Sequence, residues 1–473
     1  MKIIQLVDGY SKGDGVGNAI TAIDSLLRVK GFETEICDRT LDLADIDNPD
    51  FQGENLVLYH VAVFVDPLVT YLRCKKILVF HNITDPELLI GPGLKRVRND
   101  CSAGLYDIRG LAKYFDSAIV ASDYSKRTLV ESGWTEDKIY IVPYMIRFDK
   151  LAQDYDKQVV ERYSDDCINI LFTGRIMPNK KQEDIIYSFA KYKNSYNKNS
   201  RLFLVGGVAN KAYFEALKNL VKELHLENDV ILTGKAPFSQ YIAYYKLADV
   251  FLCMSAHEGF CIPLVEALYY NVPIIAINST AVPDTLGGSG VLLDDRDPDV
   301  VGKEIDRLVS DADYRKKILD TQKNRLSELR PEVIEKLYMD VLSQCISQVA
   351  AEVKYKVMDS RMVIYDYISI PQRIRDEENV IYGFGTACNR LLDNFRRQKI
   401  NVDCICDQNK GGVREGNIDI LYPRDAFIKY KNRNFIISIQ SKKIVKEVIC
   451  MLMNNGISED NIFIFDGSKN EIV

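Results

Sequence analysis

The segment EGFCIPLVE, from Glu258 to Glu266, carries two carboxylates on either side of a predicted helix start. Pro263 marks that start, because proline is favoured at a first helical position. Gly259 lets a ligand approach the backbone, and the free N–H groups and positive dipole of the helix end favour an anion. Since carboxylates repel phosphate, we expect Glu258 to bind sugar hydroxyls and Glu266 to bind a ribose. The alternative is a surface charge at Glu258 and simple dipole compensation by Glu266.

A second group of candidate residues lies earlier, in the segment LFTGRIMPNKKQEDII. Gly174 and Arg175 stand at the end of a predicted strand, and Lys180 stands just before a predicted helix. Arginine is a two-pronged donor and lysine is a point charge, and both suit a diphosphate. The alternative is that both are ordinary basic residues on the surface beside a helix start.

The order of these segments resembles that of the family 4 retaining glycosyltransferases. GRIMPNK, LFLVGG, VILTGK and EGFCIPLVE follow one another as in that family, and the last fits its E-x7-E motif without a gap. The resemblance implies a GT-B fold, in which two Rossmann-like domains face each other and the second binds most of a UDP- or GDP-sugar donor. The implied donor-binding residues are Gly15, Gly17, Gly174, Arg175, Lys180, Glu258, Gly259, Phe260, Cys261 and Glu266.

Two segments of the first predicted domain add to the resemblance. SKGDGVGNAI resembles the family's N-terminal glycine-rich loop, and KILVFHNITDPELL resembles an H-N-I-T-P segment in which Asp85 is inserted before Pro86. In the family this histidine lies beside the reacting sugar, so His81 is the candidate here. The alternative is a buried histidine bonded to backbone groups. His60, at another strand end, is a weaker candidate for contact with the acceptor.

The implied reaction keeps the anomeric configuration through a front-face displacement, in which the leaving phosphate helps to deprotonate the acceptor hydroxyl. The cations would stabilise the leaving diphosphate in place of a divalent metal. The D-x-D pattern in DDRD (294–297) follows a late strand, so we interpret it as a solvated turn. The four histidines lack metal-site spacing and the 11 cysteines form no C-x-x-C pair, so we expect reduced thiols, no metal site and no required cofactor. The implied catalytic residues are His81, Arg175, Lys180 and Glu258.

Short apolar runs alternate with helical stretches, which predicts an α/β fold with parallel sheets. The runs form three series, each typical of a Rossmann-like unit. The predicted strands are 2–7, 33–37, 55–60, 75–81, 117–122 and 139–144, then 168–174, 201–207, 229–234, 249–254, 272–277 and 290–295, then 379–385, 401–407, 434–439 and 461–465. A polar stretch at 151–166 predicts a linker, and 299–352 is predicted to be almost all helical. The predicted domains are 1–150 (acceptor side), 151–355 (donor side) and 356–473 (appended).

The appended region begins with a two-glycine turn in NVIYGFGTACNRLLDNF. Cys388 stands where a dinucleotide fingerprint has a third glycine, and Asp407 follows the next strand, where an acidic ribose ligand would stand. This region resembles small Rossmann-like domains appended to bacterial sugar-processing enzymes. A structural or interaction module that recruits a protein partner is favoured over a working NAD site.

Composition and charge limit the class of protein. The chain has 473 residues, 47% of them hydrophobic, and a net charge of −6, so no global positive field attracts nucleic acid. The N-terminus leads straight into a strand rather than a signal peptide, and no apolar stretch is long enough for a membrane span, so we expect a cytoplasmic protein. Lys95, Arg96 and Arg98 lie in a predicted loop, GLKRVRND, that offers peripheral contact with anionic lipid; a solvated loop is the alternative.

The leading interpretation is a retaining glycosyltransferase that acts in surface polysaccharide or glycoconjugate synthesis, on a saccharide or a lipid-linked saccharide. One alternative is a sugar-nucleotide epimerase on the same fold, which would release an altered nucleotide sugar without an acceptor. Another is a non-catalytic scaffold protein that binds sugar nucleotides. The E-x7-E segment disfavours the first alternative. The joint presence of Arg175, Lys180, Glu258 and Glu266 counts against the second.

Overall fold

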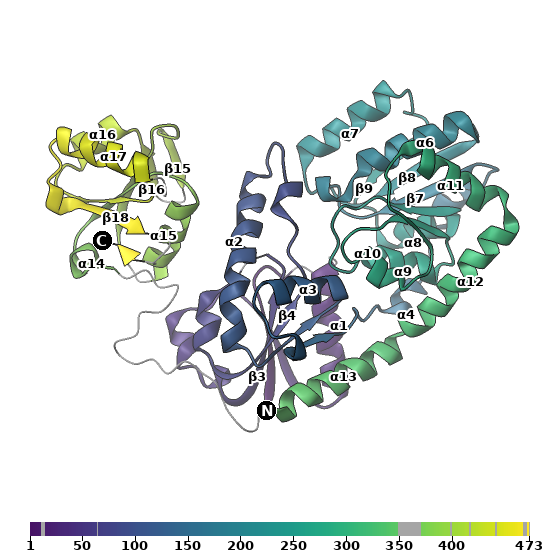
Figure 1. Ribbon diagram of the computed structural model, residues 1–473, viewed down its shortest axis with the longest axis horizontal. Coiled ribbons are helices and arrows are strands. Elements are labelled where there is room, and N and C mark those ends of the chain that lie inside the picture. Colours follow the sequence, from purple (N-terminus) through teal and green to yellow (C-terminus); the bar gives the residue numbers. More distant parts are fainter. Residues whose placement is uncertain are drawn as a thin grey trace. The chain divides into compact units, whose positions relative to one another are not determined.

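The computed structural model contains three β-sheets with helices around them (Figure 1). The first two sheets and their helices form one compact unit, and the third sheet belongs to a second unit. The structure describes residues 1–10, 15–63, 65–348, 370–397, 400–415, 418–439, 442–466 and 471–472. Residues 11–14 of the predicted glycine-rich loop, and residues 349–352 at the end of the predicted helical region, lie outside this range.

The first sheet has six parallel strands in the order β2-β1-β3-β4-β5-β6. Its inner strands β1, β3, β4 and β5 carry apolar runs, as expected for a parallel sheet that is covered on both faces, whereas the edge strand β2 is polar and partly exposed. All six were predicted at these places. The strands are β1 (Lys2–Val7), β2 (Glu33–Asp38), β3 (Gln52–Val61), β4 (Arg73–Phe80), β5 (Ser117–Val120) and β6 (Ile139–Ile141).

The second sheet also has six parallel strands, in the order β12-β11-β10-β7-β8-β9. Because strand β7 is central and the chain moves outward on each side of it, loops at its carboxyl end lie where ligands bind in open α/β sheets. The strands are β7 (Ile168–Thr173), β8 (Ser200–Val205), β9 (Val230–Gly234), β10 (Val250–Cys253), β11 (Ile274–Ile277) and β12 (Val291–Leu293).

Thirteen described helices accompany these two sheets. The last of them packs against the first sheet although it follows the second in the chain: the Lys75 side chain donates to the Ile346 carbonyl (3.1 Å), and Ser117 donates to the Cys345 sulfur (3.1 Å). The helices are α1 (Gly15–Val29), α2 (Lys95–Leu111), α3 (Asp123–Glu131), α4 (Phe148–Leu151), α5 (Lys157–Tyr163), α6 (Gln182–Ser195), α7 (Lys211–Glu223), α8 (Phe238–Leu247), α9 (Ile262–Tyr269), α10 (Val282–Leu286), α11 (Pro298–Ser310), α12 (Ala312–Glu328) and α13 (Pro331–Gln348).

The third sheet has the order β15-β16-β14-β13-β17-β18-β19. Its central pairs are parallel, and the two outer pairs, β15 with β16 and β18 with β19, are antiparallel. The strands are β13 (Asn379–Tyr382), β14 (Val402–Cys406), β15 (Val413–Glu415), β16 (Ile418–Leu421), β17 (Asn434–Ile437), β18 (Ile462–Asp466) and β19 (Glu471–Ile472), and the helices are α14 (Gln372–Asp376), α15 (Thr386–Arg397), α16 (Pro423–Lys429) and α17 (Lys442–Asn454).

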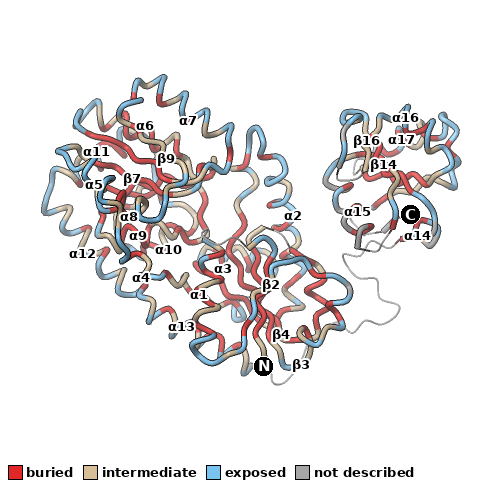
Figure 2. Tube along the Cα trace, turned by 180° about the vertical axis from the view of Figure 1, so that it is seen from behind, coloured by how far each residue is buried: buried red, intermediate tan, exposed pale blue. Residues whose placement is uncertain are grey.

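Buried residues concentrate in the strands of each sheet (Figure 2). The predicted α/β class with parallel sheets is therefore confirmed. Two local predictions were wrong. The stretch 151–166 is not a plain linker, because Asp156 caps helix α5, which packs against α8. The stretch 93–100 is not a loop, because α2 begins at Lys95 without a side-chain cap to mark its start. Lys95, Arg96 and Arg98 are exposed on that helix.

Candidate active site

The carboxyl ends of the first two sheets meet. Asn82, which follows β4, lies 2.9 Å from His257 (Nδ2 to Nε2), and Ser122, which follows β5, donates to the Gly259 carbonyl at 2.8 Å. His257 and Gly259 follow β10. Because the strand ends of parallel sheets carry the candidate residues, this contact brings the segment around His81 to the segment EGFCIPLVE.

Gly259 is required by this contact. A Cβ atom at position 259 would lie 2.8 Å from the Asn82 Cβ and 2.8 Å from the His81 carbonyl oxygen, far closer than van der Waals contact. The space that the sequence assigned to a ligand is thus occupied by backbone from the first sheet. Any side chain at this position would force the two sheet edges apart.

The start of helix α9 has an unusual backbone. Cys261 has φ 69° and ψ 72°, a left-handed conformation that costs a residue with a side chain about 1–2 kcal/mol. Pro263 occupies a first-turn position of the helix, as predicted. A Cβ built on Gly15, in the first turn of α1, would lie 3.5 Å from the Ile262 side chain. The N-terminal ends of α1 and α9 therefore converge, and both present a positive dipole end to the same place.

Lys180 and Glu258 form an ion pair at this place. The Lys180 Nζ donates to the Glu258 Oε1 at 2.6 Å, and the two side chains are only 16% and 10% exposed. Lys180 ends a short 3-10 turn (Pro178–Lys180) just before α6. Arg175, from the end of β7, is exposed. The arrangement thus combines one paired cation, one exposed cation and one carboxylate.

Glu266 lies one turn into α9 and is held by two tyrosines of α8. The hydroxyls of Tyr241 and Tyr245 donate to its Oε2 at 2.6 Å and 2.9 Å. Burial raises the pKa of Glu266, and these two hydrogen bonds oppose the rise. Neither tyrosine was predicted as a site residue, although their spacing of four residues places them on one face of a helix.

His81 is bonded at both ring nitrogens. Its Nε2 lies 2.9 Å from His60 Nδ1, and its Nδ1 lies 2.8 Å from the Tyr144 hydroxyl. The two histidine rings are stacked, and burial lowers the pKa of His81 to about 4. The ring is therefore neutral near pH 7. A contact with a sugar through the ring would require one of the two bonds to open.

The other predicted donor-binding residues lie around the same strand and helix ends. Gly17 is buried in α1, and its carbonyl accepts a hydrogen bond from the Thr21 hydroxyl. Gly174 follows β7 with φ 154°. Phe260 is buried with its ring 5.2 Å from that of Tyr144. All predicted site residues thus belong to the unit formed by the first two sheets.

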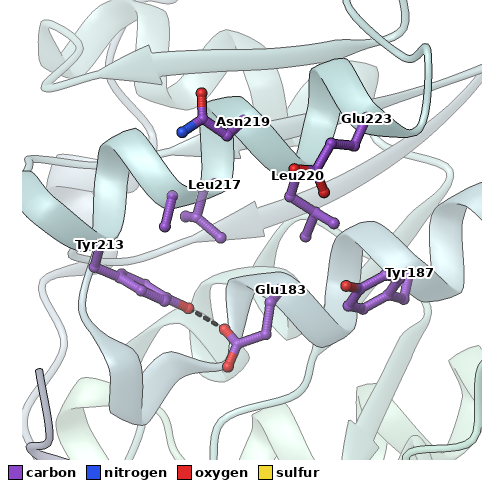
Figure 3. A pocket seen from close by; sticks show the side chains of 8 residues that line it. Glu183, Tyr187, Tyr213, Leu217, Asn219, Leu220 and Glu223 are labelled. Atoms are coloured by element: carbon purple, nitrogen blue, oxygen red, sulfur yellow. Dashed lines mark hydrogen bonds between the residues drawn. The ribbon is translucent and has the colours of Figure 1, made fainter.

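A groove lies between α6 and α7, and Figure 3 shows the side chains that line it. Its volume is about 490 Å³, and no predicted site residue lines it. Within it, the Tyr213 hydroxyl donates to Glu183 and accepts from the Gln182 N–H at 3.0 Å. These bonds tie α7 to the first turn of α6, directly after Lys180, which gives this part of the groove a structural role.

Three further predictions concern regions outside the site. The DDRD stretch is a mostly exposed turn between β12 and α11, as predicted. In the third sheet, Asp407 accepts the N–H of Phe384 at 2.8 Å and that of Asn409 at 2.8 Å, so both carboxylate oxygens are bonded to the protein's own backbone. No helix in the described ranges combines the length and the apolar character that crossing a bilayer requires.

The region of the second sheet is similar in sequence to known proteins. Residues 156–325 match the family described as glycosyl transferases group 1. An uncharacterized glycosyltransferase of Methanocaldococcus jannaschii is 30% identical over 178 residues, which cover 36% of this chain and 42% of that protein. The D-inositol 3-phosphate glycosyltransferase of Corynebacterium efficiens is 26% identical over 150 residues, which cover 31% of this chain and 35% of that protein. The chain thus spans less than half the length of these two curated relatives.

A solved structure extends the likeness beyond residues 156–325. Anabaena HepE, in complex with UDP and glucose, superposes with a TM-score of 0.57 at 15% identity, covering 73% of this chain and 100% of that chain. At this identity the likeness shows the fold alone. Residues 156–325 are therefore similar to the glycosyl transferases group 1 family, and they lie within a chain that has the GT-B fold.

Proposed function

We propose that the protein is a retaining, metal-independent glycosyltransferase that moves a sugar from a UDP- or GDP-sugar to a hydroxyl acceptor. The observation that carries the proposal is the Lys180–Glu258 ion pair, where the N-terminal ends of α1 and α9 converge, together with Arg175, which is exposed after the end of β7. Cations and helix ends suit a diphosphate, and a carboxylate beside them suits sugar hydroxyls. The family match and the UDP complex of HepE support the same assignment.

Each donor group has a matching side chain in the proposal. Arg175 and Lys180 bind the diphosphate, where negative charge grows as the bond to the sugar breaks. Glu258 holds hydroxyls of the donor sugar. Glu266 holds the ribose through the carboxylate oxygen that Tyr241 and Tyr245 do not use.

His81 has a positioning role near the reacting sugar. Its neutral ring is fixed by His60 and Tyr144, so it does not serve as an acid or base while both bonds persist. The leaving phosphate itself takes up the acceptor proton. Domain 1–150 supplies the acceptor side, 151–355 the donor side, and 356–473 is an appended module that recruits a protein partner.

The acceptor is a saccharide or a lipid-linked saccharide of a surface polysaccharide or glycoconjugate. Lys95, Arg96 and Arg98, exposed on α2, give the chain a basic face for peripheral contact with anionic lipid on the cytoplasmic side. Sedimentation with anionic liposomes at low salt tests this contact. Absence of the protein from the vesicle pellet would exclude it.

The test of function is a panel of nucleotide sugars scored for turnover and slow hydrolysis, with product configuration read by NMR and activity repeated in a chelator. Arg175→Ala should lower kcat at least tenfold, about 1.4 kcal/mol. Arg330→Ala, which removes another exposed arginine of the same unit, should stay within about twofold, well under 1 kcal/mol. Equal turnover in both variants would remove Arg175 from the site. Release of an altered nucleotide sugar without acceptor would favour an epimerase instead.

A further inference from the structure

Cys253, Glu258 and Cys261 bring two thiols and a carboxylate together beside Lys180. Their ligand atoms lie within 4.8 Å of one another, and the three residues are 0%, 9% and 7% exposed. Cys253 ends β10 and Cys261 precedes α9, so a strand end and a helix start fix both sulfurs. Within the part of the chain that the structure describes, this is the one group of three such side chains.

The spacing of the three atoms is close to that of a tetrahedral metal site. A zinc-class ion holds thiolate sulfur at about 2.3 Å and carboxylate oxygen at about 2.1 Å, which separates neighbouring ligand atoms by about 3.6–3.8 Å. The observed group needs to contract by at most about 1.2 Å to reach that separation. Three protein ligands would leave the fourth position for water, as in open zinc sites.

The charges of such a site balance. Two thiolates and one carboxylate contribute three negative charges, and a divalent cation together with Lys180 contributes three positive ones. Lys180 donates to Oε1 of Glu258, so the ion would take the second oxygen. A ligating carboxylate that is itself hydrogen-bonded is usual in metal sites. A buried group of charges with no net excess avoids the cost of an unpaired ion.

Both cysteines are free, and the Cys253 thiol donates to the Ser255 hydroxyl at 3.5 Å. Thiolates, not thiols, ligate metal, so a bound ion replaces the thiol protons and binding releases them to the buffer.

We propose that Cys253, Glu258 and Cys261 form a binding site for a thiophilic divalent cation of the zinc class, and that the bound cation inhibits transfer by withholding Glu258 from the donor sugar. The inhibition rests on the function proposed above, whereas the binding does not. No metal site was predicted from the sequence, because the four histidines lack metal-site spacing and the cysteines form no C-x-x-C pair.

Binding is tested on the full chain, after its cysteines have been reduced with a reductant that contains no thiol. The chain is then dialysed against Zn²⁺, and Co²⁺ serves as a spectroscopic reporter of thiolate ligation. We expect one tight equivalent, proton release, and a thiolate-to-metal absorption band. Cys253→Ser and Cys261→Gly should weaken binding at least tenfold. Cys450→Ser removes an exposed thiol and should leave binding unchanged.

Cys261→Gly separates loss of the ligand from misfolding, because glycine adopts the backbone angles of Cys261 without strain. Unchanged Zn²⁺ binding in Cys253→Ser and Cys261→Gly, or its loss in Cys450→Ser, would overturn the site. In the turnover assay, Zn²⁺ should inhibit the wild type at least tenfold more strongly than Cys261→Gly. Tight binding without inhibition would overturn the inhibitory role. An absence of any turnover, with binding intact, would count against the proposed function alone.

Discussion

Removal of Lys180 should destabilise the first unit through the carboxylate that it leaves behind. Breaking a fully buried ion pair by deleting one partner costs about 3–5 kcal/mol. The side chains of Lys180 and Glu258 are 16% and 10% exposed. Because the pair is not fully buried, we expect Lys180→Met to lower the free energy of unfolding by about 2–3 kcal/mol. In a domain of this size that corresponds to a fall in Tm of about 4–12 °C.

A double-mutant cycle in scanning calorimetry isolates the pair. Glu258→Gln should cost less than Lys180→Met, because a lysine without its partner can extend toward water. The double variant should be at least about 1 kcal/mol more stable than the sum of the single losses predicts. A coupling below about 0.5 kcal/mol would show that the two side chains do not depend on each other. Turnover of Lys180→Met should also fall at least tenfold, about 1.4 kcal/mol.

Three further predictions concern single residues. Gly259→Ala should lower the free energy of unfolding by about 1–3 kcal/mol, because its Cβ would lie 2.8 Å from the His81 carbonyl oxygen; an alanine variant as stable as the wild type would show that the sheet edges separate freely. Burial raises the pKa of Glu266 above 4.5, so the native state holds this proton more tightly than the unfolded chain does, and the group's contribution to stability falls as the pH rises above 4.5. Thermal unfolding measured across this pH range should show no such loss of stability for Glu266→Gln. If the variant and the wild type lose stability in parallel, the raised pKa of Glu266 is refuted. Burial lowers the pKa of His81 from 6.5 to about 4, so on acidification the unfolded chain binds this proton before the native state does. The free energy of unfolding should therefore fall by about 2 kcal/mol between pH 8 and pH 5. His81→Gln should lose less stability over this range, and an equal loss would contradict a neutral buried ring.

Most strands of the parallel sheets could be predicted because they contain a short apolar run that is buried on both faces, as in β5 and β10. The first turn of α2 could not, since neither a capping side chain nor an apolar stripe marks Lys95. Strands β15, β16 and β19 are short, and each belongs to an antiparallel pair at one end of the third sheet. Their pairing depends on neighbours distant in sequence, which local patterns do not encode.

Residue types in the candidate site could be read from the sequence, but their partners could not. Glu258 and Lys180 were both singled out, and their direct contact arises only when two strand ends meet at one edge. Gly259 was assigned to ligand approach, whereas the structure places the backbone of the first sheet against it. Tyr241 and Tyr245 resemble ordinary core tyrosines in an amphipathic stretch, so nothing local marked them as partners of a carboxylate.

Direct binding of nucleotide sugars tests the central claim most sharply, because it needs no acceptor. Isothermal titration of the wild type with UDP, GDP and their sugars should find at least one tight ligand. Glu266→Gln should weaken that binding at least tenfold, about 1.4 kcal/mol, while Glu227→Gln, which changes an exposed glutamate of the same domain, should not. If no nucleotide sugar binds the wild type, or if both variants bind as the wild type does, the site proposed here is wrong.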